Sequence, residues 1–301
     1  MNYLATIIIP TMFSNVDYLK NCLLSLQQLK FDPSLNQTQI QIIIVCNTSQ
    51  QEMIKIQKKF QTLLKTQIKD YQIAWQWLCL GKNTGFTGAV NVGIKQAQSK
   101  FIVLLNDDTV VDENWLSELI LTQQKTGAKM VASKIYLSDK KTLDSQGFGF
   151  AWRGKAEALD ENLKCSLSSE KDYWLNNIDL LPKAIMKEPF GPDAAAALYT
   201  KELFDKIGLF AEDFFAYLED VDLALRARQA GMNCVLADKA VVYHFKHASS
   251  RKKQGFKVKQ DLKNWWKIVI RRFSVKVWLK FCLLILVERL KNLSGYLKSI
   301  K

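Results

Sequence analysis

Hydrophobic and polar positions alternate between two periods along the first half of the chain. Short apolar runs rich in β-branched residues predict strands, and apolar positions three and four residues apart predict helices. The predicted strands cover residues 4–10, 40–46, 73–80, 101–105 and 130–136, and the predicted helices cover residues 18–29, 53–64, 88–98 and 114–126. This alternation predicts an α/β fold with a doubly wound sheet that is mostly parallel in its first half.

The pattern changes after residue 136. Residues 138–190 are polar and irregular, which predicts a hairpin and substrate-facing loops. An apolar segment (194–199), two helices (201–207 and 220–230) and two short strands (235–237 and 241–244) are predicted to follow. From residue 256 onward the apolar spacing is helical throughout, which predicts a C-terminal helical extension.

Two adjacent carboxylates directly follow the buried strand predicted at residues 101–105. They are Asp107 and Asp108, preceded by Asn106. Ligands of doubly wound sheets bind beyond the carboxyl ends of the strands, and carboxylate oxygens are good ligands for Mg²⁺ or Mn²⁺. A turn that caps the next helix is the structural alternative. The residues alone leave metal binding and capping both open.

A glycine-rich segment, GKNTGFTGAVNVGI at residues 81–94, lies between a predicted strand and a predicted helix. Its glycines allow close backbone approach, and free amides at a helix start suit a diphosphate or its sugar. The spacing of the glycines matches neither the P-loop nor the dinucleotide-binding fingerprint. A turn needed only for packing is the alternative.

A third cluster of chemistry-bearing residues is the segment FFAYLEDVDLALRARQAG. Glu219, Asp220 and Asp222 begin a predicted helix after a run of aromatic residues. Aromatic neighbours desolvate a carboxylate and move its pKa toward that of a useful base, whereas the structural alternative is stabilisation of the helix dipole. His244 ends a predicted strand, and it would contact a metal or phosphate if the acids share its sheet edge.

Together the ordered motifs resemble a known family. IIIPT, IIIVCNTS, GKNTGFTGAVNVGI, LLNDDT, FFAYLEDVDLALRARQAG and VVYHF resemble the inverting family 2 glycosyltransferases, in particular the rhamnosyltransferase-like and galactofuranosyltransferase-like subgroup. The resemblance implies a GT-A fold, which is a Rossmann-like, mixed, mostly parallel sheet flanked by helices. It also implies hexosyl transfer from dTDP-rhamnose or a UDP-sugar to a glycan or lipid-linked acceptor in bacterial surface polysaccharide or lipopolysaccharide synthesis, with Mn²⁺ or Mg²⁺ as cofactor.

The resemblance also implies a role for particular residues. Asp108 and His244 correspond to metal ligands, and Asp220 corresponds to the general base, with Glu219 beside it. The positions implied to bind the nucleotide-sugar donor are Thr11, Asn47, Asn83, Gly85, Asn91, Asn106 and Asp107. Cys46 stands where the family usually has an aspartate that helps read the base. The choice between uracil and thymine therefore stays open.

Charge divides the chain into two parts. Residues 251–301 contain 15 basic and 2 acidic residues, whereas residues 1–250 contain 27 of each. We therefore predict a catalytic domain over residues 1–250 and a basic amphipathic helical tail over residues 251–301. The tail is expected to dock on an anionic membrane surface, and the alternative is packing on the catalytic body or in a homodimer.

Several function classes are disfavoured by the sequence. The beginning of the chain lacks the features of a signal peptide, and the longest apolar run of the tail is far shorter than the ~20 residues that cross a bilayer. We therefore expect a cytoplasmic protein, peripheral on the inner face of the membrane. A metal-dependent nucleotidyltransferase is the enzymatic alternative, but residues 10–17 contain no basic residue for a triphosphate. The neutral body argues against a nucleic-acid partner.

Overall fold

The computed structural model describes most of the chain. The described residues are 3–35, 39–66, 68, 71–151, 155–159, 188–246 and 254–273, with positions 275, 279, 282, 283, 286, 287, 289, 290 and 293. Residues 160–187 of the predicted substrate-facing loops, the second histidine at 247 and parts of the apolar run 281–287 lie outside the described residues.

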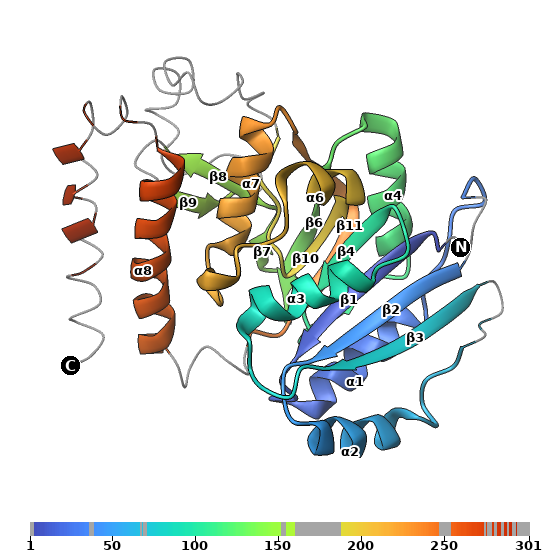
Figure 1. Ribbon diagram of the computed structural model, residues 1–301. Coiled ribbons are helices and arrows are strands. Elements are labelled where there is room, and N and C mark those ends of the chain that lie inside the picture. The colour runs from blue at the N-terminus through green and yellow to red at the C-terminus, as the bar shows by residue number, and fades with distance from the viewer. Residues whose placement is uncertain are drawn as a thin grey trace.

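The first half forms the predicted alternation of strands and helices (Figure 1). Its elements are β1 (Ala5–Thr11), α1 (Val16–Leu26), β2 (Gln39–Cys46), α2 (Gln50–Phe60), β3 (Gln72–Cys79), α3 (Gly85–Gln96) and β4 (Phe101–Leu105). β1 pairs in parallel with both β2 and β4, and β2 pairs in parallel with β3. The carboxyl ends of these four strands therefore lie at the same edge of the sheet.

The second half makes the sheet mixed. Its elements are β5 (Thr109–Val111), α4 (Trp115–Thr126), β6 (Met130–Leu137), β7 (Leu143–Ser145), β8 (Phe148–Ala151), β9 (Lys155–Ala158), β10 (Ala196–Thr200), α6 (Lys201–Ile207), the short η2 (Glu212–Phe214), α7 (Glu219–Gln229) and β11 (Cys234–His244). The strand order is β3-β2-β1-β4-β10-β6-β11-β5, with β7 beside β6 and a separate β8-β9 hairpin. β10 runs antiparallel to β4 and β6. The two short strands predicted at 235–237 and 241–244 form one strand, irregular between Ala237 and Val241.

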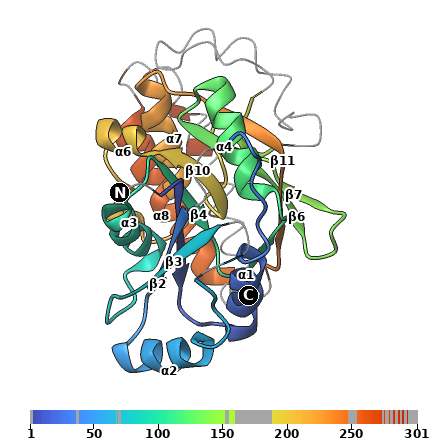
Figure 2. The ribbon, with the colours of Figure 1, turned by 90° about the vertical axis from the view of Figure 1, so that its right-hand side faces the viewer.

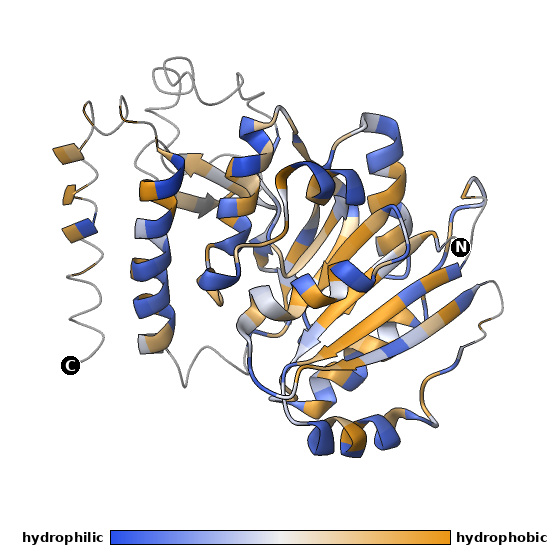
Figure 3. Cartoon of the chain, in the orientation of Figure 1, coloured by the Kyte–Doolittle hydropathy of each residue, from blue (hydrophilic) through white to orange (hydrophobic). Residues whose placement is uncertain are grey.

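Two layers of helices cover the sheet (Figure 2). α1, α2 and α4 contribute to one hydrophobic cluster, and α3, α6 and α7 contribute to the other. In β1, Ile7 and Ile9 belong to the first cluster and Ile8 to the second, because successive side chains of a strand face opposite sides. Burial on both sides explains why β4 and most of β1 and β2 are apolar, whereas the edge strand β3, which is mostly half-buried, is more polar (Figure 3).

The helix α8 (Gln254–Arg272) packs against α7. Trp265, Ile268 and Val269 are 4% exposed or less. Sequence patterning assigns this helix to the tail, whereas the structure packs one of its faces on the catalytic body (Figure 1). Within the described part of the chain, no helix is both long and apolar enough to span a bilayer.

Candidate active site

The first group of candidate residues meets at the carboxyl edge of the sheet. Thr11 ends β1, and its hydroxyl donates a 2.6 Å hydrogen bond to Oδ2 of Asp107, which follows β4. The backbone amide of Asn106 donates to the carbonyl oxygen of Ala195 (2.8 Å). β10 runs antiparallel to β4, so the amino end of β10 lies at the edge where β4 has its carboxyl end. The hydrogen bond from Asn106 to Ala195 joins the two segments at this edge. Segments distant in sequence therefore line one site.

His244, at the end of β11, lies between two carboxylates. Its Nε2 is 3.2 Å from Oδ1 of Asp108, and its Nδ1 is 3.3 Å from Oδ2 of Asp144. Burial by itself would lower the pKa of His244, but the two carboxylates outweigh burial and raise the pKa to about 9. Asp144 in β7 also pairs with Lys246. Sequence analysis missed Asp144, which carries no recognisable local motif.

The side chain of Asp107 has a raised pKa. Burial raises the pKa of Asp107 to about 7, against the opposing effect of the hydrogen bond from Thr11. The adjacent Asp108 adds to the rise, since two neighbouring negative charges disfavour each other. A nearby cation would favour the charged form of Asp107.

The residues at this edge fit a divalent cation. Oδ1 of Asp108 and Nε2 of His244 are 3.2 Å apart, and neighbouring ligands of an octahedral ion with bonds of about 2.1 Å lie about 3 Å apart. Carboxylate oxygens suit Mg²⁺ or Mn²⁺, and an imidazole nitrogen suits transition-metal ions. Among the described residues, no three carboxylate, thiolate or imidazole groups form a complete metal cage. Asp108 and His244 could therefore supply two of the ligands of such an ion.

The glycine-rich segment is held by asparagine side chains. Oδ1 of Asn47 accepts a hydrogen bond from the amide of Thr84 (2.7 Å), and its Nδ2 donates to the carbonyl oxygen of Gly85 (2.8 Å). Oδ1 of Asn83 accepts from the amide of Gly85 (2.9 Å). The amide of Thr87 donates to the carbonyl oxygen of Phe215 (3.2 Å). Three backbone amides of this segment, which the sequence predicts to offer free amides to a ligand, are therefore bonded within the protein.

Gly85 lies against the loop that contains Phe215, and no other residue fits at this position. Its φ is +76°, and a Cβ at this position would overlap the carbonyl oxygen of Phe215. Asn91, two turns further along α3, is buried and bonds the backbone of Phe210 through both ends of its amide (2.8 and 3.1 Å). Its amide is engaged within the protein, and its part in donor binding stays a prediction.

The loop before Glu219 and Asp220 has an unusual backbone. Phe215, Tyr217 and Leu218 have φ values of 65°, 69° and 64°. Large side chains rarely adopt this left-handed region, and each such residue costs about 1–3 kcal/mol. Asn264 of α8 supports the loop, and its Nδ2 donates to the carbonyl oxygens of Phe214 (2.8 Å), Ala216 (2.9 Å) and Tyr217 (2.8 Å). Sequence analysis missed Asn264, because it lies in a helix assigned to the tail.

Asp220 and Glu219 begin α7 and differ in accessibility. Asp220 is partly exposed, and its Oδ1 accepts a hydrogen bond from the amide of Val221 (2.8 Å). Burial and the nearby charge of Asp193 raise the pKa of Asp220 to about 7. Glu219 is 7% exposed, and its Oε2 has no hydrogen-bond partner among the described residues. Burial and the charge of Asp220 raise the pKa of Glu219 well above its usual range. Asp220 is therefore the better candidate for a base at neutral pH.

Two further acids near this loop have different roles. Asp193, which sequence analysis missed, precedes β10 and accepts a hydrogen bond from the amide of Ala195 (2.9 Å). Asp222 is fully buried and binds two arginines, Arg226 (2.9 Å) in α7 and Arg272 (2.7 Å) in α8. Each carboxylate oxygen of Asp222 thus accepts a hydrogen bond from a guanidinium group. Asp222 therefore joins α7 to α8.

Comparison with known sequences identifies a family. Residues 6–180 match the sequence model of glycosyl transferase family 2. The chain is 27% identical over 172 residues to the O-antigen biosynthesis protein RfbC of Myxococcus xanthus, an alignment that covers 54% of this chain and 12% of that protein. It is 22% identical over 195 residues to the low-salt glycan biosynthesis hexosyltransferase Agl10 of Haloferax volcanii, covering 61% of this chain and 56% of that protein. The chain thus spans less than two thirds of these relatives.

Comparison with solved structures identifies the same fold. The mannosyltransferase PcManGT of Pyrobaculum calidifontis, solved with GDP-Man and Mn²⁺, superposes with a TM-score of 0.60 at 11% identity, covering 99% of this chain and 75% of that chain. Residues 1–349 of TarS of S. aureus superpose with a TM-score of 0.54 at 15% identity, covering 95% of this chain and 71% of that chain. At these identities the likeness shows the fold, and the sequence match supplies the family. The chain therefore belongs to glycosyl transferase family 2 and has the GT-A fold.

Proposed function

We propose that this protein is an inverting, metal-dependent glycosyltransferase that moves a sugar from a nucleoside diphosphate to an acceptor hydroxyl. The observation that carries the proposal is the presence of two kinds of group near Asp193, whose charge raises the pKa of both His244 and Asp220. Asp108 and His244 form a close pair with metal-ligand chemistry (3.2 Å), whereas Asp220 is a separate carboxyl whose pKa is about 7. The family match favours this reaction over the nucleotidyltransferase alternative.

The proposed reaction needs both groups. In a single displacement, the acceptor oxygen forms a bond to the anomeric carbon as the bond to the nucleoside diphosphate breaks. Asp220 takes the proton of the attacking hydroxyl and is ready to do so near neutral pH. A divalent cation held by Asp108 and His244 would offset the charge on the departing diphosphate. Asp144 holds the other ring nitrogen of His244 and so orients the imidazole.

The donor and acceptor are proposed by class. Family-related proteins are named for O-antigen and low-salt glycan biosynthesis, and structural neighbours were solved with UDP or GDP-Man. We propose dTDP-rhamnose or a UDP-sugar as donor, and a glycan or lipid-linked acceptor of bacterial surface polysaccharide synthesis. Mn²⁺ or Mg²⁺ is the proposed ion.

A donor screen tests the reaction. The whole chain is incubated with UDP-, GDP- and dTDP-sugars, with Mn²⁺, Mg²⁺ or EDTA, and the released nucleoside diphosphate is measured. We expect release from one donor class with a divalent ion and loss of release with EDTA. Anomeric NMR of the product should show inversion at the transferred sugar. Release of pyrophosphate in place of a nucleoside diphosphate would contradict the proposal.

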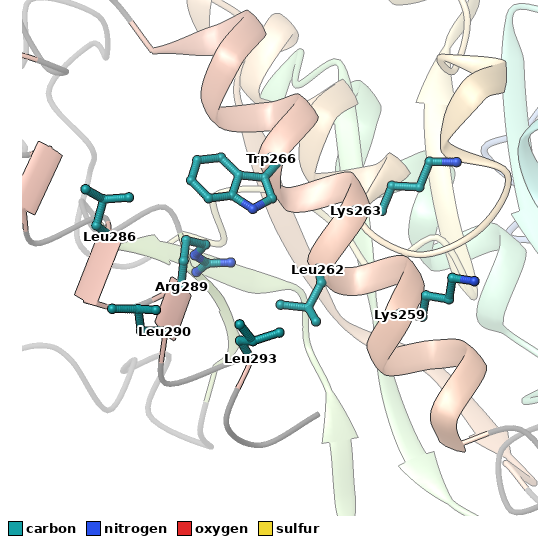
Figure 4. Close-up of a pocket in the computed structure, with 8 residues that line it drawn as sticks. All are labelled: Lys259, Leu262, Lys263, Trp266, Leu286, Arg289, Leu290 and Leu293. Carbon is teal, nitrogen blue, oxygen red and sulfur yellow. The ribbon is translucent and has the colours of Figure 1, made fainter. Parts of the chain in front are cut away.

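We also propose that the outer side of α8 docks on an anionic membrane. A groove of about 390 Å³ is lined by Lys259, Leu262, Lys263, Trp266, Leu286, Arg289, Leu290 and Leu293 (Figure 4). Apolar side chains spaced three or four residues apart are 43–80% exposed on the segment that follows, namely Val275, Leu279, Leu283, Leu286, Leu290 and Leu293. Basic residues beside apolar ones match the chemistry of an anionic headgroup above acyl chains.

Charge favours a lipid surface over a second copy of the chain. Residues 251–301 hold 15 basic and 2 acidic residues, so two such tails would repel each other, whereas an anionic bilayer attracts them. Flotation with phosphatidylglycerol vesicles tests this, and the double variant Lys259→Glu, Lys263→Glu should reduce binding. A variant of exposed lysines away from the groove, Lys55→Glu with Lys58→Glu, should bind like wild type. Absence of flotation at low salt, with a concentration-dependent dimer, would instead support the homodimer.

A further inference from the structure

The loop that precedes Glu219 and Asp220 is attached to α8 on both sides. Before the loop, Asp213 accepts a hydrogen bond from Nη2 of Arg271 (2.7 Å). After the loop, Asp222 accepts one from Nε of Arg272 (2.7 Å). The loop with three left-handed residues lies between these two ion pairs, and so do the two acids. α8 thus fixes both ends of the segment that presents Asp220.

Asn264 holds the middle of this segment. Its Nδ2 lies within 2.9 Å of three carbonyl oxygens, those of residues 214, 216 and 217. In a regular helix or strand, the carbonyl groups bond to backbone amides of the same helix or sheet. Here residues 215 and 217 are left-handed, and the three carbonyl groups all point toward Nδ2 of Asn264. A two-hydrogen donor at that point satisfies several of them together, which makes this backbone shape favourable.

The burial of Asn264 is hard to explain by packing alone. The side chain is 0% exposed, and its Oδ1 has no hydrogen-bond partner among the described residues. Burying an unsatisfied polar atom is unfavourable, and an apolar side chain would fill the position without that penalty. The hydrogen bonds that the amide nitrogen donates to three carbonyl oxygens of the loop therefore outweigh the free-energy cost of burying the amide oxygen without a partner.

We propose that Asn264 is a positioning residue that sets the backbone of residues 214–217 and thereby aims the carboxyl of Asp220 at the acceptor. The proposal rests on the proposed function in one respect, namely that Asp220 is the base. It extends the functional unit beyond residue 250, because part of the catalytic geometry is supplied by α8. Asn264 itself touches neither of the proposed substrates.

Asn264→Asp tests the proposal, because it keeps the shape and replaces the donor with a carboxylate that faces three carbonyls. Val269→Ala is the matched control, since it removes buried methyl groups from the same helix and leaves the hydrogen bonds to the loop. Amide hydrogen exchange of residues 214–221 should accelerate in Asn264→Asp and stay as in wild type in Val269→Ala. This measurement needs no substrate.

Turnover separates positioning from folding. With the donor found in the screen, Asn264→Asp should lower kcat by about 10–10²-fold, as expected for a displaced catalytic group, while the Kd for UDP or dTDP changes less than twofold. The acid limb of its pH profile should also move to lower pH, because a loosened loop exposes Asp220 to water. Val269→Ala should keep the kcat of the wild type even where its melting temperature is lower.

Two outcomes would overturn the proposal. Unchanged exchange of residues 214–221 in Asn264→Asp, or faster exchange with kcat retained, overturns it. If the wild type transfers no sugar from any donor, the proposed function fails, while the exchange data still show whether Asn264 holds the loop. If Asn264→Asp does not fold, Arg271→Gln loosens the exposed attachment at Asp213, and the same two readouts apply to that variant.

Discussion

The two sides of the candidate site are held in place by different means. On the metal side, Thr11, Asp108 and His244 follow or end strands, and the hydrogen-bonded ladder of the sheet places them. On the base side, Asp220 follows a loop of left-handed residues that depends on Asn264 of a distant helix. A sheet edge positions residues by its own register, whereas an irregular loop needs support from outside itself.

The electrostatics of the two sides also differ. His244 is paired with carboxylates on both ring nitrogens. The pKa values of Asp220 and Glu219 are raised by burial and by the charge of another acid, which is Asp193 for Asp220 and Asp220 for Glu219. A cation could replace the proton on Nε2 of His244 and bind between His244 and Asp108, because a metal ligand must be deprotonated. A carboxyl whose neighbours are acids instead holds its proton near neutral pH and suits a base.

The largest expected effect is on the metal side. Asp108→Ala should abolish transfer and Mn²⁺ binding, since it removes one of two proposed protein ligands, while the melting temperature of the metal-free protein stays nearly unchanged. Calorimetric titration of Mn²⁺ in the presence of UDP measures the loss. Asp139→Ala, an exposed acid of a nearby turn, serves as control. Full activity after EDTA treatment would show that the metal role is wrong.

On the base side, Asp220→Asn should reduce turnover by about 10²–10⁴-fold and leave nucleotide binding intact, because it removes a proton acceptor and keeps the shape. Glu219→Gln is the matched comparison. Glu219 is only 7% exposed and is therefore less accessible to an acceptor hydroxyl than Asp220, so the loss should be far smaller. Near wild-type turnover in Asp220→Asn would move the base elsewhere.

A smaller effect is expected from the residue that orients His244. Asp144→Asn should weaken Mn²⁺ binding by about 10–100-fold, the usual range for the partner of a ligating histidine. Its carboxylate lies 3.3 Å from Nδ1 of His244, and an amide there no longer favours one ring orientation. Titration of Mn²⁺ with UDP present checks this. An unchanged Kd would mean that Asp144 serves only the pairing with Lys246.

The smallest expected effect is a pH dependence. The pKa of Asp220 is raised to about 7 by burial and by Asp193, so kcat should rise with pH and be about tenfold lower at pH 6 than on its plateau. Asp193→Asn removes one like charge and should move this limb to lower pH. The raised pKa also means that ionisation of Asp220 opposes folding. Stability is therefore lost as pH rises from about 4 to 7, and Asp220→Asn should melt higher than wild type at pH 8 but not at pH 4.

Much of the fold and part of the site could be predicted from local sequence. The strand–helix alternation predicted the parallel first half, because the period of apolar positions records which faces of each element are buried. Asp107 and Asp108 directly follow a predicted strand, and Asp220 begins a predicted helix, so their places at element ends could be read from their neighbours. The ordered motifs identified the family that the sequence match confirms.

Other features were decided only by the tertiary structure. Hydropathy does not record the direction of a strand, so the antiparallel β10 and the Asp193 that it brings to the site carry no local signal. The partners of a polar side chain are equally hidden, since His244 meets an aspartate 136 residues away. Asn264 lies in the segment that the sequence assigns to the tail and Asp222 among the acids of a helix start, but the packing of α8 brings both into contact with the segment around Asp220. Local patterns determine which surface an element buries, and only the packed chain determines what meets that surface.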